Sequence, residues 1–273
     1  MNELMGIIRN LPPVIVRGIL VGLLTSVSAA LLGVTLVLKR YSMIGDGLSH
    51  VAFGAMSLAL VLNFAPLMFS VPVVVASSIL LITITRKSTL GGDSSIALVS
   101  STGLSIGIAA VSLAGGVNTG VSDYMFGSIV AISKEDAYIC VPILIFVILI
   151  FVLLYNRIFA VTFDESFSKA SGMKCEFYTT IIAVLTSLTV VIGMRIMGTL
   201  LISGLIIFPA LSAMRICHSY RRVVILAAVV SFCCFILGTL SSILLDTPVG
   251  ASIVIVNAVL FCIFSLLGKF VRV

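Results

Sequence analysis

The chain has 273 residues, of which 60% are hydrophobic and 10% are charged, and this composition excludes a water-soluble domain because too few polar side chains are available to cover its surface. It indicates an all-α polytopic membrane protein that contacts the lipid bilayer along most of its length. The formal net charge is +6 at pH 7, but the basic residues stand singly or in pairs between apolar runs, as in membrane loops, so we expect no nucleic-acid binding.

Apolar runs that are long enough to cross a bilayer as helices recur along the chain, and we expect eight or nine of them. Residues 1–13 are weakly amphipathic, which predicts a short interfacial helix before the first run. In that run, Gly18, Gly22, Ser26 and Ala30 place a small residue at every fourth position, which predicts a face for close helix packing. The expected spans are about 14–38, 43–62, a third that follows the turn at 63–66 and ends near 84, 94–114, 138–155, 178–193, 199–214, 223–245 and 251–267.

The second run carries two ionisable residues, Asp46 and His50, in its first two turns. On a helix these side chains point about 40° apart and lie about 6 Å apart along the axis, so both can reach one cation. Carboxylate oxygen and imidazole nitrogen suit zinc(II), manganese(II) or iron(II), and Gly54 on the same face predicts space beside them. Ionisable groups inside a span usually mark an ion path. The alternative is that the two side chains satisfy only each other.

Residues 115–136 form the most irregular stretch between spans, with several glycines and polar side chains. Irregular backbone at membrane depth survives only where protein buries it or where it lines a water-filled path. Asn118 and Asp123 are therefore further candidate ligands for a metal ion, and the alternative for both is a solvated loop.

The longest polar interlude, residues 162–174, follows the fifth span. Thr162 and Glu165 have the spacing of a capping box, in which the threonine hydroxyl accepts from a backbone N–H and the glutamate reaches back. Gly172 supplies a helix stop. The segment therefore predicts a short helix over about 163–171.

Lysine and arginine are divided unevenly between alternate connections, which predicts the orientation of the chain. One set of connections holds twelve of the sixteen basic residues, and the other holds four, including Arg195. We expect the set with twelve, which includes the 162–174 loop, in the cytoplasm. The Asp46–His50 pair then lies a few residues into the membrane from the cytoplasmic end of its helix. Arg195 is expected to anchor the turn at the outer end rather than to bind substrate, because it would repel a metal ion.

Residues 40–50, R-Y-S-M-I-G-D-G-L-S-H, are similar to the pattern R-x-S-L-I-G-D-x-L-S-H in the second span of a known transporter family. With this segment the sequence resembles the permease subunits of ABC importers for zinc, manganese and iron. The similarity extends over nearly the whole chain, from about Leu32 to Val256, and the combination of segments is specific. The other segments are Y-M-F-G-S at 124–128, F-D-E at 163–165 through Ala170 and Gly172, R-I-M-G-T-L-L at 195–201 with Pro209-Ala210, and P-V-G-A at 248–251.

The resemblance implies one transmembrane permease domain over residues 1–273, placed in the cell membrane, that moves a divalent transition metal into the cytoplasm. Zinc is expected ahead of manganese, with iron third, and no permanently bound cofactor is expected. Asp46 and His50 are then metal-path residues. The implied partners are a second copy of the permease, a cytoplasmic ATP-binding subunit and an extracytoplasmic metal-binding protein. The residues implied in docking the ATP-binding subunit are Phe163, Asp164, Glu165, Ala170 and Gly172.

Two other classes of membrane protein compete with this interpretation. An intramembrane protease is not supported, because the sequence contains neither H-E-x-x-H nor G-x-S-G. The chain also has no G-x-x-x-x-G-K-[ST] phosphate loop, which agrees with ATP hydrolysis in a separate subunit, so we do not expect an enzyme. An ion-coupled secondary metal transporter that works without an ATPase stays as the alternative, because it too would place a carboxylate beside a histidine in a span.

Overall fold

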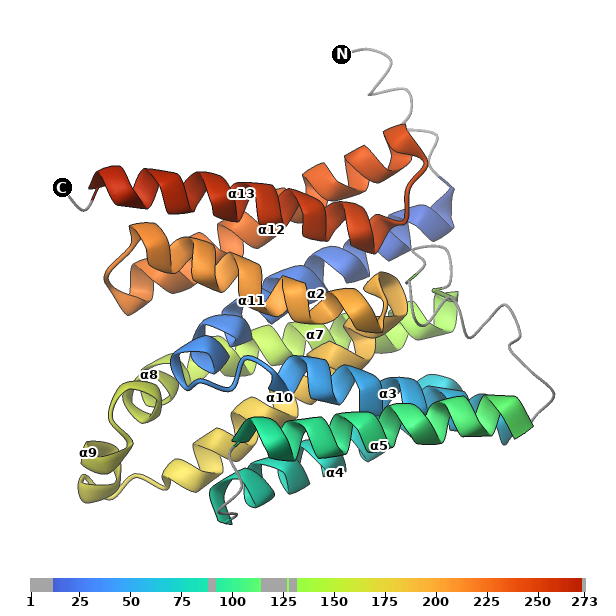
Figure 1. Cartoon of the computed structure of the whole chain (residues 1–273), viewed down its shortest axis with the longest axis horizontal. Helices are drawn as coiled ribbons and strands as arrows, with labels where there is room; N and C mark the ends of the chain where they lie inside the picture. Colours follow the sequence, from blue (N-terminus) through green and yellow to red (C-terminus); the bar gives the residue numbers. More distant parts are fainter. Residues whose placement is uncertain (1–11, 88–91, 114–126, 128–131, 272–273) are drawn as a thin grey trace.

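The computed structural model describes residues 12–87, 92–113, 127 and 132–271, and its helices lie side by side in one bundle (Figure 1). All regular secondary structure in these ranges is helical, which confirms the all-α class. Eight of the described helices are long and apolar enough to cross a membrane, and α11 adds a shorter apolar stretch, Leu201–Ile216. The helices are α2 (Pro13–Leu38), α3 (Ile44–Val61), α4 (Pro66–Lys87), α5 (Gly92–Leu113), α7 (Lys134–Leu153), α8 (Tyr155–Phe163), α9 (Glu165–Ala170), α10 (Cys175–Met197), α11 (Thr199–Ile216), α12 (Tyr220–Leu245) and α13 (Val249–Val271).

The observed spans begin and end within four residues of the expected positions. The largest difference at a helix start is in α7, which begins at Lys134 rather than near 138. Ser133 caps this helix, because its hydroxyl accepts from the backbone N–H of Asp136 at 3.0 Å and the Asp136 carboxylate reaches back to Ser133. The expected interfacial helix at 1–13 lies almost wholly outside the described residues.

Two helices, α2 and α10, lie between two groups of three (Figure 1). In one group α3, α4 and α5 pack together, and in the other α11, α12 and α13 do so. Helix α2 contacts α7, α10, α11 and α12, while α10 also contacts α3 and α4. Helices α8 and α9, which we call the arm, lie at one end of the bundle beside the ends of α2 and α10 (Figure 1). We call this end the arm end.

The small-residue face predicted on α2 packs against α12. The space that a side chain at Gly22 would need is occupied by the ring of Phe235. One turn further, Ser26 and Ser231 are fully buried, and each hydroxyl donates to the other residue's backbone carbonyl, at 3.0 and 2.8 Å. Small side chains thus let the two backbones approach, and the serines satisfy each other inside the membrane part.

Helix α5 packs against α3 through glycines. A Cβ atom added to Gly54 would overlap the backbone carbonyl of Gly103, and one added to Gly107 would lie 2.8 Å from the Cα of Gly54. The α5 backbone occupies the position that a Gly54 side chain would take, so the absence of that side chain does not by itself leave space beside Asp46 and His50. Gly54 serves helix packing.

The ends of α7 and α10 away from the arm are joined by an ion pair. Arg195 Nη1 lies 2.6 Å from Asp136 Oδ2, and both side chains are largely buried. This contact is consistent with the expected role of Arg195 as an anchor. The guanidinium also lies in the last turn of α10, where the helix dipole favours a positive charge.

The α3–α5 contact predicts a difference between two glycine substitutions. Gly54→Ala forces a methyl group against backbone that cannot rotate away, so we expect a loss of about 1–3 kcal/mol of stability. Gly204→Ala in α11 is the matched control, because its added carbon would meet only side-chain atoms of Val254 and Phe208, at 3.2 Å or more. We expect that change to be within about 1 kcal/mol of the parent, since alanine also favours the helix. Thermal unfolding of the purified protein in detergent measures both, and equal stability of the two variants would contradict the packing argument.

Candidate functional site

Asp46 and His50 lie together at the start of α3, as their spacing predicts. His50 Nε2 is 3.8 Å from Asp46 Oδ2, which is too long for a direct hydrogen bond. The other ring nitrogen of His50, Nδ1, is buried and has no hydrogen-bond partner among the described residues. The geometry therefore does not favour a pair whose members satisfy only each other.

The same distance suits two ligands of one ion. Two ligand atoms about 2.1 Å from a tetrahedral ion lie about 3.4 Å apart, so a small side-chain rotation brings Asp46 and His50 to ligating positions. The described residues contain no group of three or more histidine, cysteine, aspartate or glutamate side chains suited to a metal. Asn118 and Asp123, the other candidate ligands, lie outside the described residues. The described part of the chain thus presents two candidate ligands, both from α3.

The pair lies deep in the bundle because α3 starts there. The chain turns back after α2 through Arg40, whose φ is 61°. A side chain at Gly45 would meet Ile206 in the middle of α11, and the hydroxyl of Ser49 donates to the backbone carbonyl of Thr199, the first residue of α11. Thr199 is about 25 Å along α11 from its last residue, at 1.5 Å per residue. The pair is near the start of α3, as expected. Because α3 itself starts beside the middle of α11, the pair nevertheless lies far from the arm end of the bundle.

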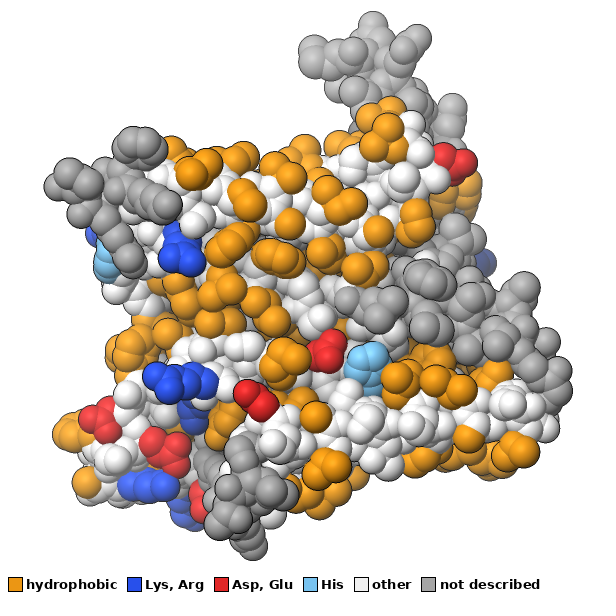
Figure 2. Space-filling model, viewed as in Figure 1, with side chains coloured by type: hydrophobic (Ala, Val, Ile, Leu, Met, Phe, Trp, Pro, Cys, Tyr) orange, Lys and Arg blue, Asp and Glu red, His pale blue; other side chains and the backbone are white. Residues whose placement is uncertain are grey.

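The pair also opens onto a surface of the bundle. The side chains of Asp46 and His50 are 32% and 17% exposed. Figure 2 shows an acidic side chain and a histidine adjoining one another near the middle of one face, among apolar side chains. A carboxylate facing hydrocarbon is costly, so this face must meet protein or water rather than lipid.

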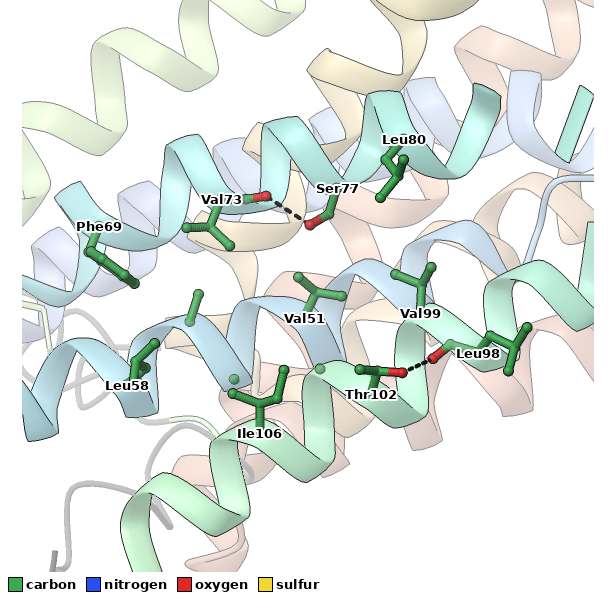
Figure 3. Close-up of a pocket in the computed structure, with 13 residues that line it drawn as sticks. Val51, Leu58, Phe69, Val73, Ser77, Leu80, Leu98, Val99, Thr102 and Ile106 are labelled. Atoms are coloured by element: carbon green, nitrogen blue, oxygen red, sulfur yellow. Dashed lines mark hydrogen bonds between the residues drawn. The ribbon is translucent and has the colours of Figure 1, made fainter. Parts of the chain in front are cut away.

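A groove lies between α3, α4 and α5 (Figure 3), but neither Asp46 nor His50 lines it. The groove has a volume of about 410 Å³, and Val51 and Gly54 of α3 help to line it. Its two hydroxyl groups are engaged within their own helices, because Ser77 donates to the Val73 carbonyl at 2.9 Å and Thr102 donates to the Leu98 carbonyl at 2.6 Å. The remaining lining is apolar, so we do not assign the metal to this groove.

The arm differs in detail from the helix predicted over 163–171. It consists of α8 and α9, which meet at Asp164. The expected capping box at Thr162 and Glu165 is wrong. Thr162 lies inside α8 and donates to the Ile158 carbonyl at 2.6 Å, whereas the Asp164 carboxylate caps α9 by accepting from the Phe167 N–H at 2.8 Å. The stop at Gly172 is confirmed by its φ of 80°.

Aromatic packing explains why α8 continues through Thr162, the predicted cap of the short helix. Tyr155, Phe159 and Phe163 follow each other at four-residue intervals, and all three rings pack against Tyr220 at the start of α12, with centroids 5.1–5.8 Å apart. The Tyr220 hydroxyl lies 3.2 Å from that of Thr35 in α2. Burial raises the pKa of Tyr155, so its phenol stays neutral. This cluster fixes α8 to both α2 and α12.

A second set of contacts fixes α9. Lys39, just after α2, has a side chain that is only 8% exposed, and its Nζ lies 3.9 Å from Glu165 Oε2. The same Nζ donates to the hydroxyl of Thr179 in α10 at 3.1 Å. Glu165 also pairs with Lys169 one turn on, at 2.9 Å. The arm is therefore tied by charge to Lys39 at the end of α2, and by aromatic packing to α12. Lys39 in turn is joined to α10 by its hydrogen bond to Thr179.

Sequence reasoning assigned five residues to one segment, and the structure places Phe163 at the end of α8 and Asp164, Glu165, Ala170 and Gly172 in or beside α9. It missed Phe167, which is 70% exposed at a helix surface outside the candidate spans. It also missed Lys39 and Thr179, which no local pattern connects. The four-residue spacing of the α8 aromatic residues is a signal that would have revealed α8.

Comparison with known proteins agrees with this arrangement. The chain is 26% identical over 247 residues to the manganese import system permease protein ScaB of Streptococcus gordonii, covering 90% of this chain and 88% of the relative. It is 28% identical over 244 residues to the high-affinity zinc uptake system membrane protein ZnuB of Haemophilus influenzae, covering 89% and 93%.

One solved structure, PsaBC from Streptococcus pneumoniae in complex with Fab, has the same fold. The TM-score is 0.85 at 24% identity, and the match covers 96% of this chain and 94% of that one. The sequence model of the ABC 3 transport family matches residues 12–268, which is nearly the full length. The chain is a multi-pass membrane protein and belongs to the ABC 3 transport family.

Proposed function

We propose that this chain is the permease subunit of an ABC importer that carries a divalent transition metal into the cytoplasm, with zinc ahead of manganese. The observation that carries the proposal is the Asp46–His50 pair, whose nearest nitrogen and oxygen lie 3.8 Å apart deep in a membrane bundle of this family. Relatives named for manganese import and for zinc uptake support the substrate class. One imidazole and one carboxylate per copy favour zinc, which prefers nitrogen ligands more than manganese does.

Two protein ligands per copy suit a site that must release its ion. A structural zinc site closes four protein ligands around the metal, whereas an incomplete shell leaves positions for water and for the next ligand on the path. The metal is therefore substrate, held briefly between Asp46 and His50. The chain is not expected to catalyse a reaction.

A second copy of the chain is the proposed cover for the face that carries the pair. Asp46 remains one-third exposed in the isolated copy, in a part of the protein that lies within the membrane. Two copies facing each other would bring two carboxylates and two imidazoles together and keep them from lipid. Mass measurement of the purified transporter in lipid nanodiscs tests this, and a single permease per particle would contradict it.

The arm is the proposed docking site for a cytoplasmic ATP-binding subunit, and a separate extracytoplasmic protein would deliver the metal. In this orientation the arm end is cytoplasmic, in agreement with the charge distribution. Phe163 and Phe167 are 58% and 70% exposed on the arm, and exposed aromatic side chains outside a bilayer favour a protein partner. A secondary transporter that needs no ATPase is not favoured, because the chain belongs to an ABC family.

The proposed path predicts that both members of the pair are needed. Asp46→Asn keeps the shape and removes the charge, and His50→Ala removes the ligating nitrogen, so each should abolish ATP-driven metal uptake in reconstituted vesicles. Asp93→Asn is the control, because it neutralises an exposed carboxylate in the first turn of α5. We expect uptake by that control to equal that of the parent protein.

Protein amount in the membrane and assembly with the ATPase are measured for every variant. If either changes in His50→Ala, His50→Gln replaces it as the milder substitution. Parental uptake by both Asp46→Asn and His50→Gln would show that the pair is structural.

The arm predicts a separation of ATP hydrolysis from transport. Gly172→Pro cannot adopt the observed φ of 80° and loses the N–H that donates to the Lys169 carbonyl at 3.0 Å, so the end of α9 must change. We expect metal uptake per ATP hydrolysed to fall strongly while membrane insertion is unchanged. Gly172→Asn is the matched control, because asparagine tolerates this backbone region, and it should retain most of the uptake. Equal uptake by the two variants would argue against a coupling role for the arm.

Metal content of cells that lack this protein identifies the substrate. We expect zinc to fall relative to cells that carry the gene, and growth in chelated medium to recover with added zinc. A fall in manganese, with rescue by manganese alone, would keep the importer class and change its substrate. Unchanged content of zinc, manganese and iron would contradict the proposal.

A further inference from the structure

A buried hydroxyl joins the Asp46–His50 turn to the neighbouring helices. Ser49 stands directly before His50 and is fully buried. Its Oγ lies 2.7 Å from the backbone carbonyl of Asp46 and 3.1 Å from the backbone carbonyl of Thr199. One hydroxyl proton is shared between these two acceptors, so the same group contacts the turn that carries the pair and the first residue of α11.

The junction that Ser49 contacts is enclosed on several sides. Helices α10 and α11 meet at Gly198, whose φ of 84° and ψ of 162° are open mainly to glycine. A Cβ atom at Gly250, at the start of α13, would overlap the Met197 carbonyl, and one at Gly127 would overlap the Met197–Gly198 peptide itself. Such close backbone contacts leave the junction little freedom to move independently of the helices around it.

The other end of α10 is held by the arm. Thr179 accepts from Lys39, which also faces Glu165 of α9, and the Cys175 thiol lies 3.7 Å from the Glu165 backbone carbonyl. Helix α10 has 23 residues and no proline, so it spans about 33 Å as one continuous helix between these contacts and the junction. It is therefore in contact with the arm at one end, and at the other end only Gly198 separates it from Thr199.

We propose that Ser49 is a positioning residue for metal transfer, through which a displacement of α10 at the arm end reaches the Asp46–His50 pair. The proposal rests on the proposed function, because it requires that the pair holds the transported metal and that the arm meets the ATPase. Ser49 itself touches no metal. Its hydroxyl keeps the pair in register with the α10–α11 junction, so that pair and junction move together.

The chain offers a matched control for this role. Ser57 lies on the same helix, is fully buried like Ser49, and its hydroxyl has no hydrogen-bond partner among the described residues. Ser49→Ala and Ser57→Ala remove the same atom from the same helix, and only the first removes a contact to α11. A difference between the two variants therefore reports the Ser49–Thr199 contact rather than the loss of a buried hydroxyl.

The experiment measures the metal transported per ATP hydrolysed by the complete transporter in vesicles, together with the thermal midpoint. A hydrogen bond of ordinary net strength corresponds to a factor of about two to ten, so we expect that ratio to fall by this factor in Ser49→Ala. Ser49→Cys retains a weak donor of similar size and should lie between Ser49→Ala and the parent. Ser57→Ala should match the parent in this ratio, and the thermal midpoint of Ser49→Ala should fall by no more than the loss of one hydrogen bond predicts.

A second substitution tests whether the two ends of α10 act together. Thr179→Val keeps the side-chain shape and removes the oxygen that accepts from Lys39. If α10 carries the displacement, the loss of transport per ATP in the double variant with Ser49→Ala will be smaller than the product of the two single losses. Independent, multiplying effects would overturn the connection through α10.

The outcomes separate this proposal from the proposed function. If Ser49→Ala transports as much metal per ATP as the parent while Asp46→Asn transports none, the positioning role is wrong and the metal path stands. If the ratio falls only in proportion to a lower thermal midpoint, the hydroxyl is structural and the positioning role is again wrong. If Asp46→Asn also transports normally, the proposed function fails first.

Discussion

The constraint on which this structure depends is that a polar group in hydrocarbon must find a partner inside the protein, because an unsatisfied one costs several kcal/mol. Most of the buried hydroxyls obey it locally, as when Thr25 donates to the Val21 carbonyl one turn back, or mutually, as in the Ser26–Ser231 pair. Asp46 and His50 do not reach hydrogen-bonding distance of each other. Some buried hydroxyls, including that of Ser57, also have no partner among the described residues, but a carboxylate is more costly to leave in hydrocarbon than a hydroxyl. The pair therefore marks the place where the membrane part has to meet water, an ion or a second chain.

The architecture relates that place to the arm through very few elements. Helix α2 ends at the charged contacts of α9, the chain turns back through Arg40, and α3 then presents the pair. Helix α10 begins near the same charged contacts. At its other end a single residue, Gly198, separates it from Thr199, whose carbonyl accepts from Ser49. Two short routes thus connect the arm with the pair, one along the chain and one through α10. The aromatic cluster on Tyr220 adds a fixed point at α12.

Features that depend on local sequence were predictable, and features that depend on long-range contacts were not. Periodic small residues predicted the packing face of α2, and the i, i+4 spacing predicted that Asp46 and His50 share one face. The depth of the pair was missed, because the position of the α3 start is fixed by contacts with α11 that are 150 or more residues away in sequence. The capping box at Thr162 was wrong for a similar reason. Packing of α8 on Tyr220 extends that helix past Thr162 and leaves the capping role to Asp164.

The glycine contact between α3 and α5 has a consequence for the membrane itself. Helix α5 has only 17% of its span buried inside the protein, so most of its surface faces its surroundings, while its backbone lies directly against α3 at Gly54 and Gly103. No long side chains separate the two helices at this contact and absorb a displacement. A change of tilt that α5 makes to match a thicker or thinner bilayer is therefore passed to the helix that carries Asp46 and His50. If the proposed metal path through this pair holds, the hydrophobic thickness of the bilayer becomes a physical variable of metal transfer without any lipid-binding site.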